Sequence, residues 1–416
     1  MGQTFAEKIL SKYSGRKVVP GEIVEVKPDI AMSHDNTAAI SVTFEQLGVD
    51  KLDDPDRHVI VLDHCTPPAN EKFAMNHKIT RNFVKKHGIK HFFDIEQGIC
   101  HQVIIENGLC LPGTVMVGAD SHSTTYGAFG AFGTGIGRSE TAVIMATGKI
   151  WFRVPETIKI IIHGEFPDGV GSKDLILKIA GEIKADGALY KAVEFAGPTI
   201  ENMTISSRIV LPNMAVELGA KIGYMIPNKE TLEYLEGRAQ KEFEVVESDS
   251  DAHFEKVLEF DISDLVPQIA CPHTVDNVKP VTEVEGTKID EVFFGSCTNA
   301  RLEDFEVVAE VLKGNQIHAD VRMLVFPASK DIFLEAMRLG YVQTIAEAGA
   351  IIMNTGCGPC MGNHEGVPAD GEVVLATNNR NYKGRLGNNE SEVYLSSPLV
   401  SAHSAIKGFI TDPRNN

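Results

Sequence analysis

Short apolar runs of strand length alternate with amphipathic stretches along most of the chain. In the first two thirds, the runs at 58–62, 114–118 and 158–162 predict strands, and the spacing of apolar positions over 172–183 predicts a helix. The last third repeats this alternation, with strands predicted over 290–295, 322–326, 350–354 and 372–376, and helices over 302–312, 330–339 and 399–406. Strands that alternate with helices are typical of an α/β protein with mainly parallel sheets.

The pattern changes character at two places along the chain. The first change lies near Val154 and Pro155, and the second in the stretch Val278–Pro280 and the polar residues 283–288, which we interpret as a linker. A chain of 416 residues accommodates about three domains. We therefore predict three α/β domains, over residues 1–152, 153–282 and 283–416.

Chemically dense segments directly follow the predicted strands. In doubly wound α/β folds, functional residues gather just beyond the carboxyl ends of the strands. That rule selects Asp63–His64, Asp120–His122, Cys297–Asn299, Cys357–Cys360 and Asn379–Arg385. The agreement between predicted topology and chemistry indicates one functional site built from these loops.

The composition excludes several classes of protein. The 39 basic and 57 acidic residues give a net charge of −18, which disfavours a general nucleic-acid binder. An anionic substrate would then need local positive charge at its site. The apolar runs are too short for a membrane span, and the N-terminal residues lack the pattern of a signal peptide. Seven cysteines, an odd and sparse count, favour a reducing cytoplasm over a disulfide scaffold.

Three cysteines lie in polar, glycine-rich segments. Cys357 and Cys360 form a C-x-x-C pair in NTGCGPCMG, and Cys297 lies in GSCTNAR. The pair alone is compatible with half a zinc site, a redox dithiol or an iron–sulfur site. Three thiolates without an obvious fourth suit a cubane cluster in which one iron lacks a protein ligand and can act as a Lewis acid. We expect the remaining cysteines to be small buried apolar residues: Cys65, Cys100, Cys110 and Cys271.

The chain resembles the aconitase superfamily, and within it the large subunits of the 3-isopropylmalate dehydratase and homoaconitase type. The motifs that carry the resemblance are GADSH (118–122), GSCTN (295–299), GCGPCMG (356–362) and NRNYKGR (379–385). The resemblance implies three α/β/α domains around a [4Fe-4S] cluster. It also implies that Cys297, Cys357 and Cys360 hold this cluster, with the fourth iron free for water and substrate.

The same resemblance implies roles for individual residues. Asp63 and His64 would protonate a departing hydroxyl group, while Asp120 and His122 would order an iron-bound water. His101 matches a further catalytic histidine of the family. Implied substrate contacts are His34, Ser121, Asn379, Arg380 and Arg385, since arginine clamps carboxylates with two hydrogen bonds. Residues implied on the cluster side are Asn213, Glu217 and Asn299.

Two of these assignments carry structural expectations of their own. Asn213 and Glu217 are four residues apart, which would place them on one face of a helix. Arg301 is a lesser candidate that could pair with nearby carboxylates.

The glycine run from Gly127 to Gly137 does not complete a nucleotide-binding G-x-G-x-x-G pattern, because position 138 is Arg, so we expect close backbone packing there instead.

The function implied is that of half an enzyme. In the split enzymes of the superfamily, a separate small subunit carries the closing (swivel) domain, and we expect that partner here, with no nucleic acid and no membrane. The substrate would be a small 2-hydroxy di- or tricarboxylate, and the reaction would interconvert 2-isopropylmalate and 3-isopropylmalate by dehydration and rehydration in leucine biosynthesis.

Other functions remain open from the sequence alone. Homoaconitate, citraconate and 2,3-dimethylmalate hydratases would use the same machinery. The chain also departs from the DSHTCTHG frequent in dehydratases, because Thr124 and Tyr126 replace a Cys and a His, which weakens the choice among branches. A non-catalytic metal-binding scaffold and a dithiol redox protein that uses Cys357 and Cys360 are the alternatives from other classes.

Overall fold

The computed structural model describes residues 2–415, which form four β-sheets with helices packed around them. Nearly all strand pairs are parallel, and the exceptions are β1–β7, β12–β13 and β12–β18. The predicted α/β class with mainly parallel sheets is therefore confirmed. None of the helices described between residues 2 and 415 combines the length and the apolar character needed to cross a bilayer.

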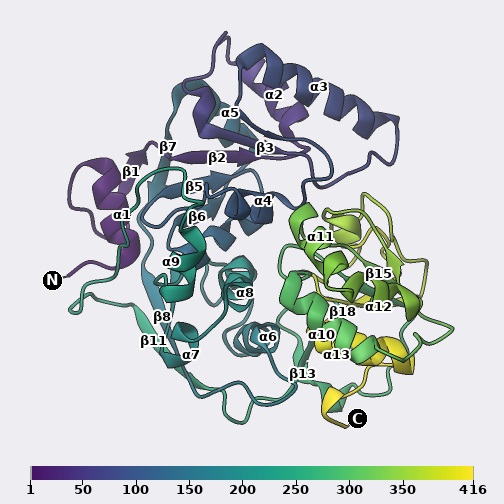
Figure 1. Cartoon of the computed structure of the whole chain (residues 1–416). Helices are drawn as coiled ribbons and strands as arrows, with labels where there is room; N and C mark the ends of the chain where they lie inside the picture. The colour runs from purple at the N-terminus through teal and green to yellow at the C-terminus, as the bar shows by residue number, and fades with distance from the viewer. Residues whose placement is uncertain (1, 416) are drawn as a thin grey trace.

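The first part of the chain folds around a five-stranded parallel sheet with the order β4-β3-β2-β5-β6. Its strands are β2 (Ile30–Ser33), β3 (His58–Val61), β4 (His91–Phe93), β5 (Val115–Gly118) and β6 (Phe132–Gly135). Its helices are α2 (Thr37–Gln46), α3 (Glu71–His87), α4 (Cys100–Glu106) and α5 (Arg138–Thr147). Helices α2, α3 and α5 share one apolar core on one face of the sheet, at the top of Figure 1, and α4 belongs to the core on the other face.

A short antiparallel ribbon joins this part to the N-terminal helix. Helix α1 (Phe5–Ser14) packs beside β1 (Ile23–Val26), which pairs with β7 (Ile150–Arg153). A capping box starts α1: Thr4 accepts the backbone N–H of Glu7, and Glu7 accepts the backbone N–H of Thr4.

The second part contains a four-stranded parallel sheet with the order β10-β9-β8-β11. Its strands are β8 (Thr157–His163), β9 (Ala192–Ala196), β10 (Ile222–Tyr224) and β11 (Lys256–Asp261), and its helices are α6 (Ser172–Ile183), α7 (Pro198–Glu201), α8 (Ile205–Ala215) and α9 (Lys229–Leu235). Helix α6 is buried on most sides, because its apolar residues join one core with residues of this sheet and of the third sheet.

The third part is built on a seven-stranded sheet with the order β13-β12-β18-β17-β14-β15-β16. Its strands are β12 (Gln268–Ala270), β13 (Val278–Pro280), β14 (Glu291–Phe294), β15 (Arg322–Val325), β16 (Ile351–Ile352), β17 (Val373–Ala376) and β18 (Glu392–Leu395). Helices α10 (Leu302–Leu312), α11 (Lys330–Arg338), α12 (Tyr341–Glu347) and α13 (Pro398–Lys407) lie with this sheet at the right of Figure 1.

The linker predicted over Val278–Pro280 and residues 283–288 is wrong in its first half. Val278–Pro280 forms β13, an edge strand that pairs antiparallel with β12, and the edge position tolerates Pro280 because its missing N–H is not needed by a further strand. Strands β12 and β13 thus belong to the third sheet although they lie before residue 283. For the domains we therefore propose a boundary ahead of Gln268 in place of the one at 282.

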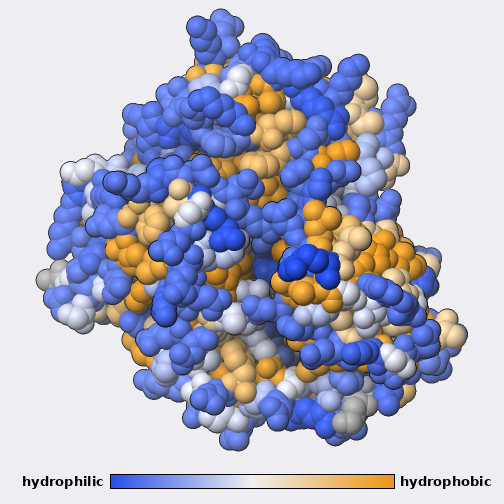
Figure 2. All heavy atoms as spheres, viewed as in Figure 1, coloured by the Kyte–Doolittle hydropathy of each residue, from blue (hydrophilic) through white to orange (hydrophobic). Residues whose placement is uncertain are grey.

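Glycines allow the backbone of the first two parts to approach closely. A Cβ at Gly127, in the first part, would lie 1.6 Å from the carbonyl oxygen of Gly223 in the second part. Within the first part, a Cβ at Gly135 would lie 2.8 Å from Cα of Ser121. These contacts confirm close packing in the glycine run. Figure 2 shows this face of the molecule hollowed near its centre, between the parts just described.

Candidate functional site

The loops that follow the strands of the first and third sheets border one cavity of about 490 Å³. From the first part, the lining side chains include His34, His64, His101, Asp120, Ser121 and His122. From the third part, they include Cys297, Cys357, Cys360, Met361, Arg380 and Arg385. Residues far apart in the sequence are thus brought together, as the rule of strand ends predicts.

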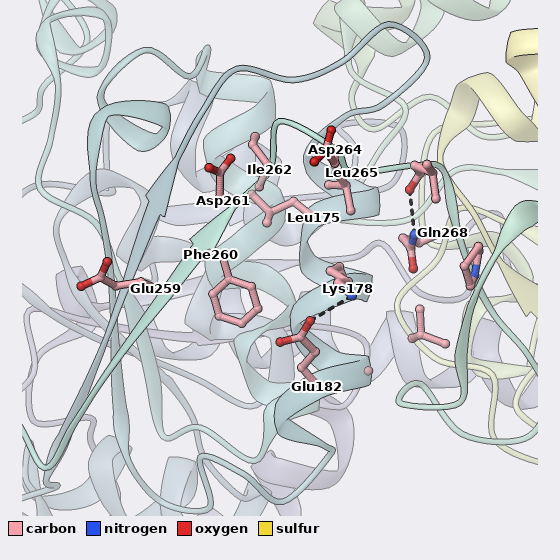
Figure 3. A pocket seen from close by; sticks show the side chains of 14 residues that line it. Leu175, Lys178, Glu182, Glu259, Phe260, Asp261, Ile262, Asp264, Leu265 and Gln268 are labelled. Carbon is pink, nitrogen blue, oxygen red and sulfur yellow. Dashed lines mark hydrogen bonds and ion pairs between the residues drawn. The ribbon is translucent and has the colours of Figure 1, made fainter.

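A second cavity of about 500 Å³ lies between α6, β11 and the β12–β13 edge, and Figure 3 shows it from close by. The lining of this cavity includes the acidic residues Glu259, Asp261 and Asp264. On α6, an ion pair of 2.9 Å joins Lys178 to Glu182. Most of the predicted site residues line the first cavity instead, and the others, Asp63, Asn213, Glu217, Asn299 and Asn379, are not among its lining residues. Because its charged lining is mostly acidic, this second cavity repels an anionic substrate, and we do not assign the reaction to it.

Asp63 and His64 form a buried pair at the end of β3. The Nδ1–H of His64 donates to Asp63 Oδ1 at 2.5 Å, and Asp63 Oδ2 accepts the backbone N–H of Cys100 at 2.7 Å. Burial opposes the charged imidazole, but Asp63, Cys357 and Asp120 together outweigh it, so the pKa of His64 lies well above its usual value. His64 therefore holds a proton beside the cavity.

Two residues other than Asp63, namely His34 and Asp120, also contact the His64 ring. Its ring stacks on that of His34 with 3.9 Å between centroids, and its Nε2 lies 3.5 Å from Asp120 Oδ2. Burial lowers the pKa of His34 to about 4, and the charge of His64 contributes to this decrease. His34 is thus the neutral member of a stacked pair whose other member is charged.

Asp120 is the centre of a second group, at the end of β5. Its Oδ1 accepts the Nε2–H of His101 at 3.0 Å and the backbone N–H of His122 at 2.8 Å. Burial would raise the pKa of Asp120, but His101 and His122 hold it well below the usual value. The carboxylate is therefore ionised and can order a polar ligand in the cavity.

His122 connects the group around Asp120 to Glu217 in the second part of the chain. Its Nε2 lies 3.1 Å from Glu217 Oε1, and its pKa is raised to about 9, because Cys297, Asp120 and Glu217 outweigh the opposing effect of burial. On the other side, Nδ1 of His101 lies 3.1 Å from the hydroxyl of Tyr126, which burial keeps protonated by raising its pKa.

Side-chain N–H groups point at the cysteine sulfurs. Asn213 and Asn379 approach Cys297 Sγ through their Nδ2 atoms at 3.1 and 3.4 Å, and Arg385 Nη2 lies 3.5 Å from Cys360 Sγ. The hydroxyl of Ser296 lies 4.0 Å from both Cys297 Sγ and Cys360 Sγ, so these two sulfurs are neighbours. Donors of this kind stabilise sulfur that carries negative charge.

The thiols differ in their electrostatic surroundings. Burial would raise the pKa of Cys360, but Arg385 and His122 outweigh it and hold the pKa below the usual value. Burial raises the pKa of Cys357 well above its usual value, although His64 opposes the increase. Soft sulfur donors of three cysteines around an open cavity, with amide and guanidinium donors behind them, fit an iron–sulfur cluster that keeps one exposed iron.

The two arginines of the NRNYKGR loop both line the cavity and have different neighbours. Arg380 Nε donates to Glu217 Oε1 at 2.6 Å, which fixes one edge of the guanidinium and leaves the other edge for a ligand. The Nε of Arg385 and the Oδ1 of Asn378 are buried and find no hydrogen-bond partner within residues 2–415. Unpaired buried polar atoms are costly, so a bound group would relieve them.

The predicted residues of the cluster side have mixed positions. Asn213 lies near the end of α8 and reaches Cys297, and Glu217 lies in the 3-10 turn Val216–Leu218 that directly continues α8 and reaches Arg380. The two side chains thus approach the same site, although Glu217 lies outside α8 itself. Asn299 turns its Nδ2 to Asp304 at 3.3 Å. The guanidinium of Arg301 binds the carbonyl oxygens of Cys297 and Thr298 at 2.6 Å and not a carboxylate.

Sequence reasoning missed three residues next to the site. Asp35 accepts the backbone N–H groups of Asp63, His64 and Cys65, and Asn36 holds His34 Nε2 at 2.8 Å. Both follow β2, so the rule of strand ends could have found them. Lys173 is buried behind the cysteine loops, and its place in an amphipathic helix gave no signal.

Comparison with known proteins adds the relationships of the chain. The sequence model of the Aconitase family (aconitate hydratase) matches residues 7–408. The chain is 52% identical to the 3-isopropylmalate dehydratase large subunit 1 of Methanopyrus kandleri, over 100% of this chain and 99% of that protein. It is 50% identical to the probable methanogen homoaconitase large subunit of Methanothermobacter thermautotrophicus, over 98% and 97% of the two proteins.

A solved structure shares the fold at low sequence identity. The holo-form of Thermococcus kodakaraensis aconitase X matches with a TM-score of 0.50 and 12% identity, over 98% of this chain and 91% of that one.

Proposed function

Because the chain belongs to the aconitase family, we propose that it is the cluster-binding large subunit of a hydro-lyase that interconverts 2-isopropylmalate and 3-isopropylmalate in leucine biosynthesis. The observation that carries the proposal is one cavity lined by three cysteines, two arginines, Asp120 and several histidines, one of which, His64, is paired with the buried Asp63. Seven buried cysteines with free thiols suit a reducing compartment, so we place the enzyme in the cytoplasm.

The cofactor of this proposal is a [4Fe-4S] cluster held by Cys297, Cys357 and Cys360. When bound, the cluster would supply a Lewis-acidic iron with an open coordination position, which polarises a hydroxyl or carboxylate oxygen. The amide groups of Asn213 and Asn379 and the guanidinium of Arg385 would stabilise its sulfurs.

The proton chemistry falls to the histidine–carboxylate groups. His64, kept charged by Asp63, donates its Nε2 proton to the departing hydroxyl group. Asp120, with His101 and His122 as donors, accepts a hydrogen bond from the water that leaves or returns. Arg385 and the free edge of Arg380 bind substrate carboxylates, and they supply the local positive charge that the acidic chain otherwise lacks.

The base that removes the carbon-bound proton is assigned to a partner. Relatives at 47–52% identity are named large subunits, which supports a small subunit that carries the closing domain over the cavity. In the split enzymes that domain carries a serine base. Much of the discrimination between substrates would then lie outside this chain.

The test of the proposal is turnover by the anaerobically purified large subunit with its cognate small subunit. The panel contains 2-isopropylmalate, homoaconitate, citraconate and 2,3-dimethylmalate. We expect the highest kcat/KM for 2-isopropylmalate. Turnover of homoaconitate alone would replace the proposed substrate with that of the homoaconitases, one of which is 50% identical to this chain. Loss of all turnover with a full cluster would contradict the hydro-lyase.

Cysteine variants test the cofactor separately. We expect about four iron atoms per chain in the native protein. Cys297→Ser, Cys357→Ser and Cys360→Ser should each lose most of this iron. Cys110→Ser is the matched control, because Cys110 is equally buried but lies in an apolar core. Equal iron content in all four variants would contradict the assignment of the ligands.

A further inference from the structure

Helix α6 sends one charged side chain to the back of the cysteine loops. Lys173, the second residue of α6, is only 1% exposed. Its ammonium group donates to the carbonyl oxygens of Thr377 and Asn378, both at 2.7 Å, and lies 3.4 Å from Thr298 Oγ1. A residue of the second part of the chain therefore holds the two loops of the third part that carry Cys297 and the NRNYKGR arginines.

The position is unfavourable for a cation unless something compensates for it. A positive charge in the first turn of a helix opposes the helix dipole, and a buried ammonium loses its hydration. Burial lowers the pKa of Lys173 to about 7, while the negative charges of Cys297, Asp304 and Cys360 favour the protonated form. The two carbonyl acceptors and these groups offset part of that cost, so negative charge at the cysteines favours the charged form of the side chain.

The contacts also connect Lys173 to the donors that face sulfur. Asn378 and Asn379 are adjacent, and Asn379 donates to Cys297 Sγ at 3.4 Å. By holding the carbonyl oxygens of Thr377 and Asn378, the ammonium group fixes the turn from which Asn379 reaches the sulfur. Thr298, which follows Cys297, joins the same contact through its hydroxyl group.

We infer that Lys173 is a positioning residue for the iron–sulfur cluster, whose positive charge stabilises the anionic cluster and raises its reduction potential. The inference rests on the proposed function, since it requires the cluster. A [4Fe-4S]²⁺ core held by three thiolates carries one net negative charge, and reduction adds a second. A fixed cation in a buried environment stabilises the more negative state more strongly, so it favours the reduced form.

The test uses the full chain with its small subunit, loaded with iron anaerobically and titrated reductively while the spectrum of the reduced cluster is followed. Lys173→Gln keeps an N–H donor but removes the charge, and Lys173→Arg keeps the charge. Lys178→Gln, on the half-exposed side of α6, is the control. For Lys173→Gln we expect the equilibrium constant of reduction to fall about tenfold, which corresponds to about 59 mV for one electron. Because a guanidinium preserves the positive charge, Lys173→Arg should stay within about threefold of the native protein.

The outcomes separate this inference from the proposed function. A native protein without iron contradicts the proposed function and leaves no cluster for Lys173 to act on, whereas a loaded Lys173→Gln variant with the native potential overturns the inference alone. If Lys173→Gln fails to fold or to load iron, Lys173→Arg decides. Native loading and potential in Lys173→Arg support the role of the charge, and failure of both variants reduces Lys173 to a packing residue and overturns the inference.

Discussion

The backbone N–H of Cys357 donates a hydrogen bond of 3.0 Å to the main-chain carbonyl oxygen of Asp63. This contact joins the loop of Asp63 and His64, the proposed proton-donating pair, to the C-x-x-C loop in the third part. Gly356 makes the approach possible, because its φ is +146° and a Cβ there would lie 2.8 Å from the same oxygen. The backbone of this chain thus holds the loop of the proposed proton donor against the loop of Cys357 and Cys360.

Asp63→Asn should remove most of the activity and leave the cluster in place. An amide cannot hold the pKa of His64 well above its usual value, so less of the imidazole is charged at neutral pH. We expect kcat to fall by roughly 10²–10⁴, the range of general acid catalysis. As the pH is raised, the remaining activity should be lost at a lower pH than in the native enzyme, because His64 gives up its proton earlier. Steady-state kinetics over a pH series and iron analysis would measure this.

Asp94→Asn is the control for that variant, because Asp94 forms an ion pair with Arg81 at the surface. Its kcat should match the native value. The role given to the pair would be contradicted if the Asp63→Asn enzyme kept both its iron and roughly the native kcat, because the loss of a general acid lowers kcat far more than that.

Tyr126→Phe should weaken catalysis through His101. The Tyr126 hydroxyl is buried and donates to His101 Nδ1 at 3.1 Å, which leaves the Nε2–H of His101 to donate to Asp120. Without the hydroxyl, the buried Nδ1 loses its partner, at a cost of about 1–3 kcal/mol. We expect kcat to fall about tenfold with little change in KM.

Tyr341→Phe, which removes an exposed hydroxyl bound to Glu306, should behave like the native enzyme in the same kinetic assay. If Tyr126→Phe keeps the native kcat, or if its kcat and KM change in equal proportion, the tautomer argument fails.

Gly127→Ala should destabilise the fold by separating its first two parts. A Cβ at this position would lie 1.6 Å from the carbonyl oxygen of Gly223, and backbone on both sides cannot move easily. Overpacking a core costs about 1–3 kcal/mol, and we expect a loss at or above the upper end of that range. Urea unfolding would measure it, with Gly171→Ala as the control because its Cβ would meet open space. Equal unfolding free energies for the two variants would contradict the close approach.

Glu291→Gln should flatten the dependence of stability on pH. Burial raises the pKa of Glu291 to about 7 in the folded chain, from 4.5, although Arg322 opposes the increase. The folded state then keeps a proton that the unfolded state releases, so the free energy of unfolding falls as pH rises from about 4.5 to about 7. The effect amounts to at most roughly 3 kcal/mol.

Thermal unfolding at about pH 5 and about pH 8 would measure this effect. The decrease in Tm between the two pH values should be smaller in Glu291→Gln than in the native chain, and unchanged in Glu390→Gln, whose carboxylate is exposed. Parallel decreases in the native chain and Glu291→Gln would rule out a raised pKa at Glu291.

The sequence predicts the elements best where several signals coincide. Helices α6 and α10 begin and end where their amphipathic patterns do, and each carries an aspartate at its third position that caps the first turn. Strands β12 and β13 have three residues each, which is too few for periodicity to distinguish them from a linker. Their pairing depends on contacts with the third sheet, which a local pattern does not contain.

The candidate site divides in the same way. Residues in loops that follow strands, such as His64, Asp120 and Cys297, can be found because topology and chemistry point to the same positions. Lys173 cannot be found in this way, since a lysine in an amphipathic helix is normally expected to face solvent. Its burial follows from the packing of α6 between two sheets, a tertiary effect.

The cavity takes its histidines from the first part of the chain and its cysteines and arginines from the last. During synthesis, the ribosome releases His64 and Asp120 long before Cys297, Cys357 and Arg385. No intermediate nascent chain possesses the complete pocket, so the proposed cluster could acquire its three cysteine ligands only after translation of nearly the entire polypeptide.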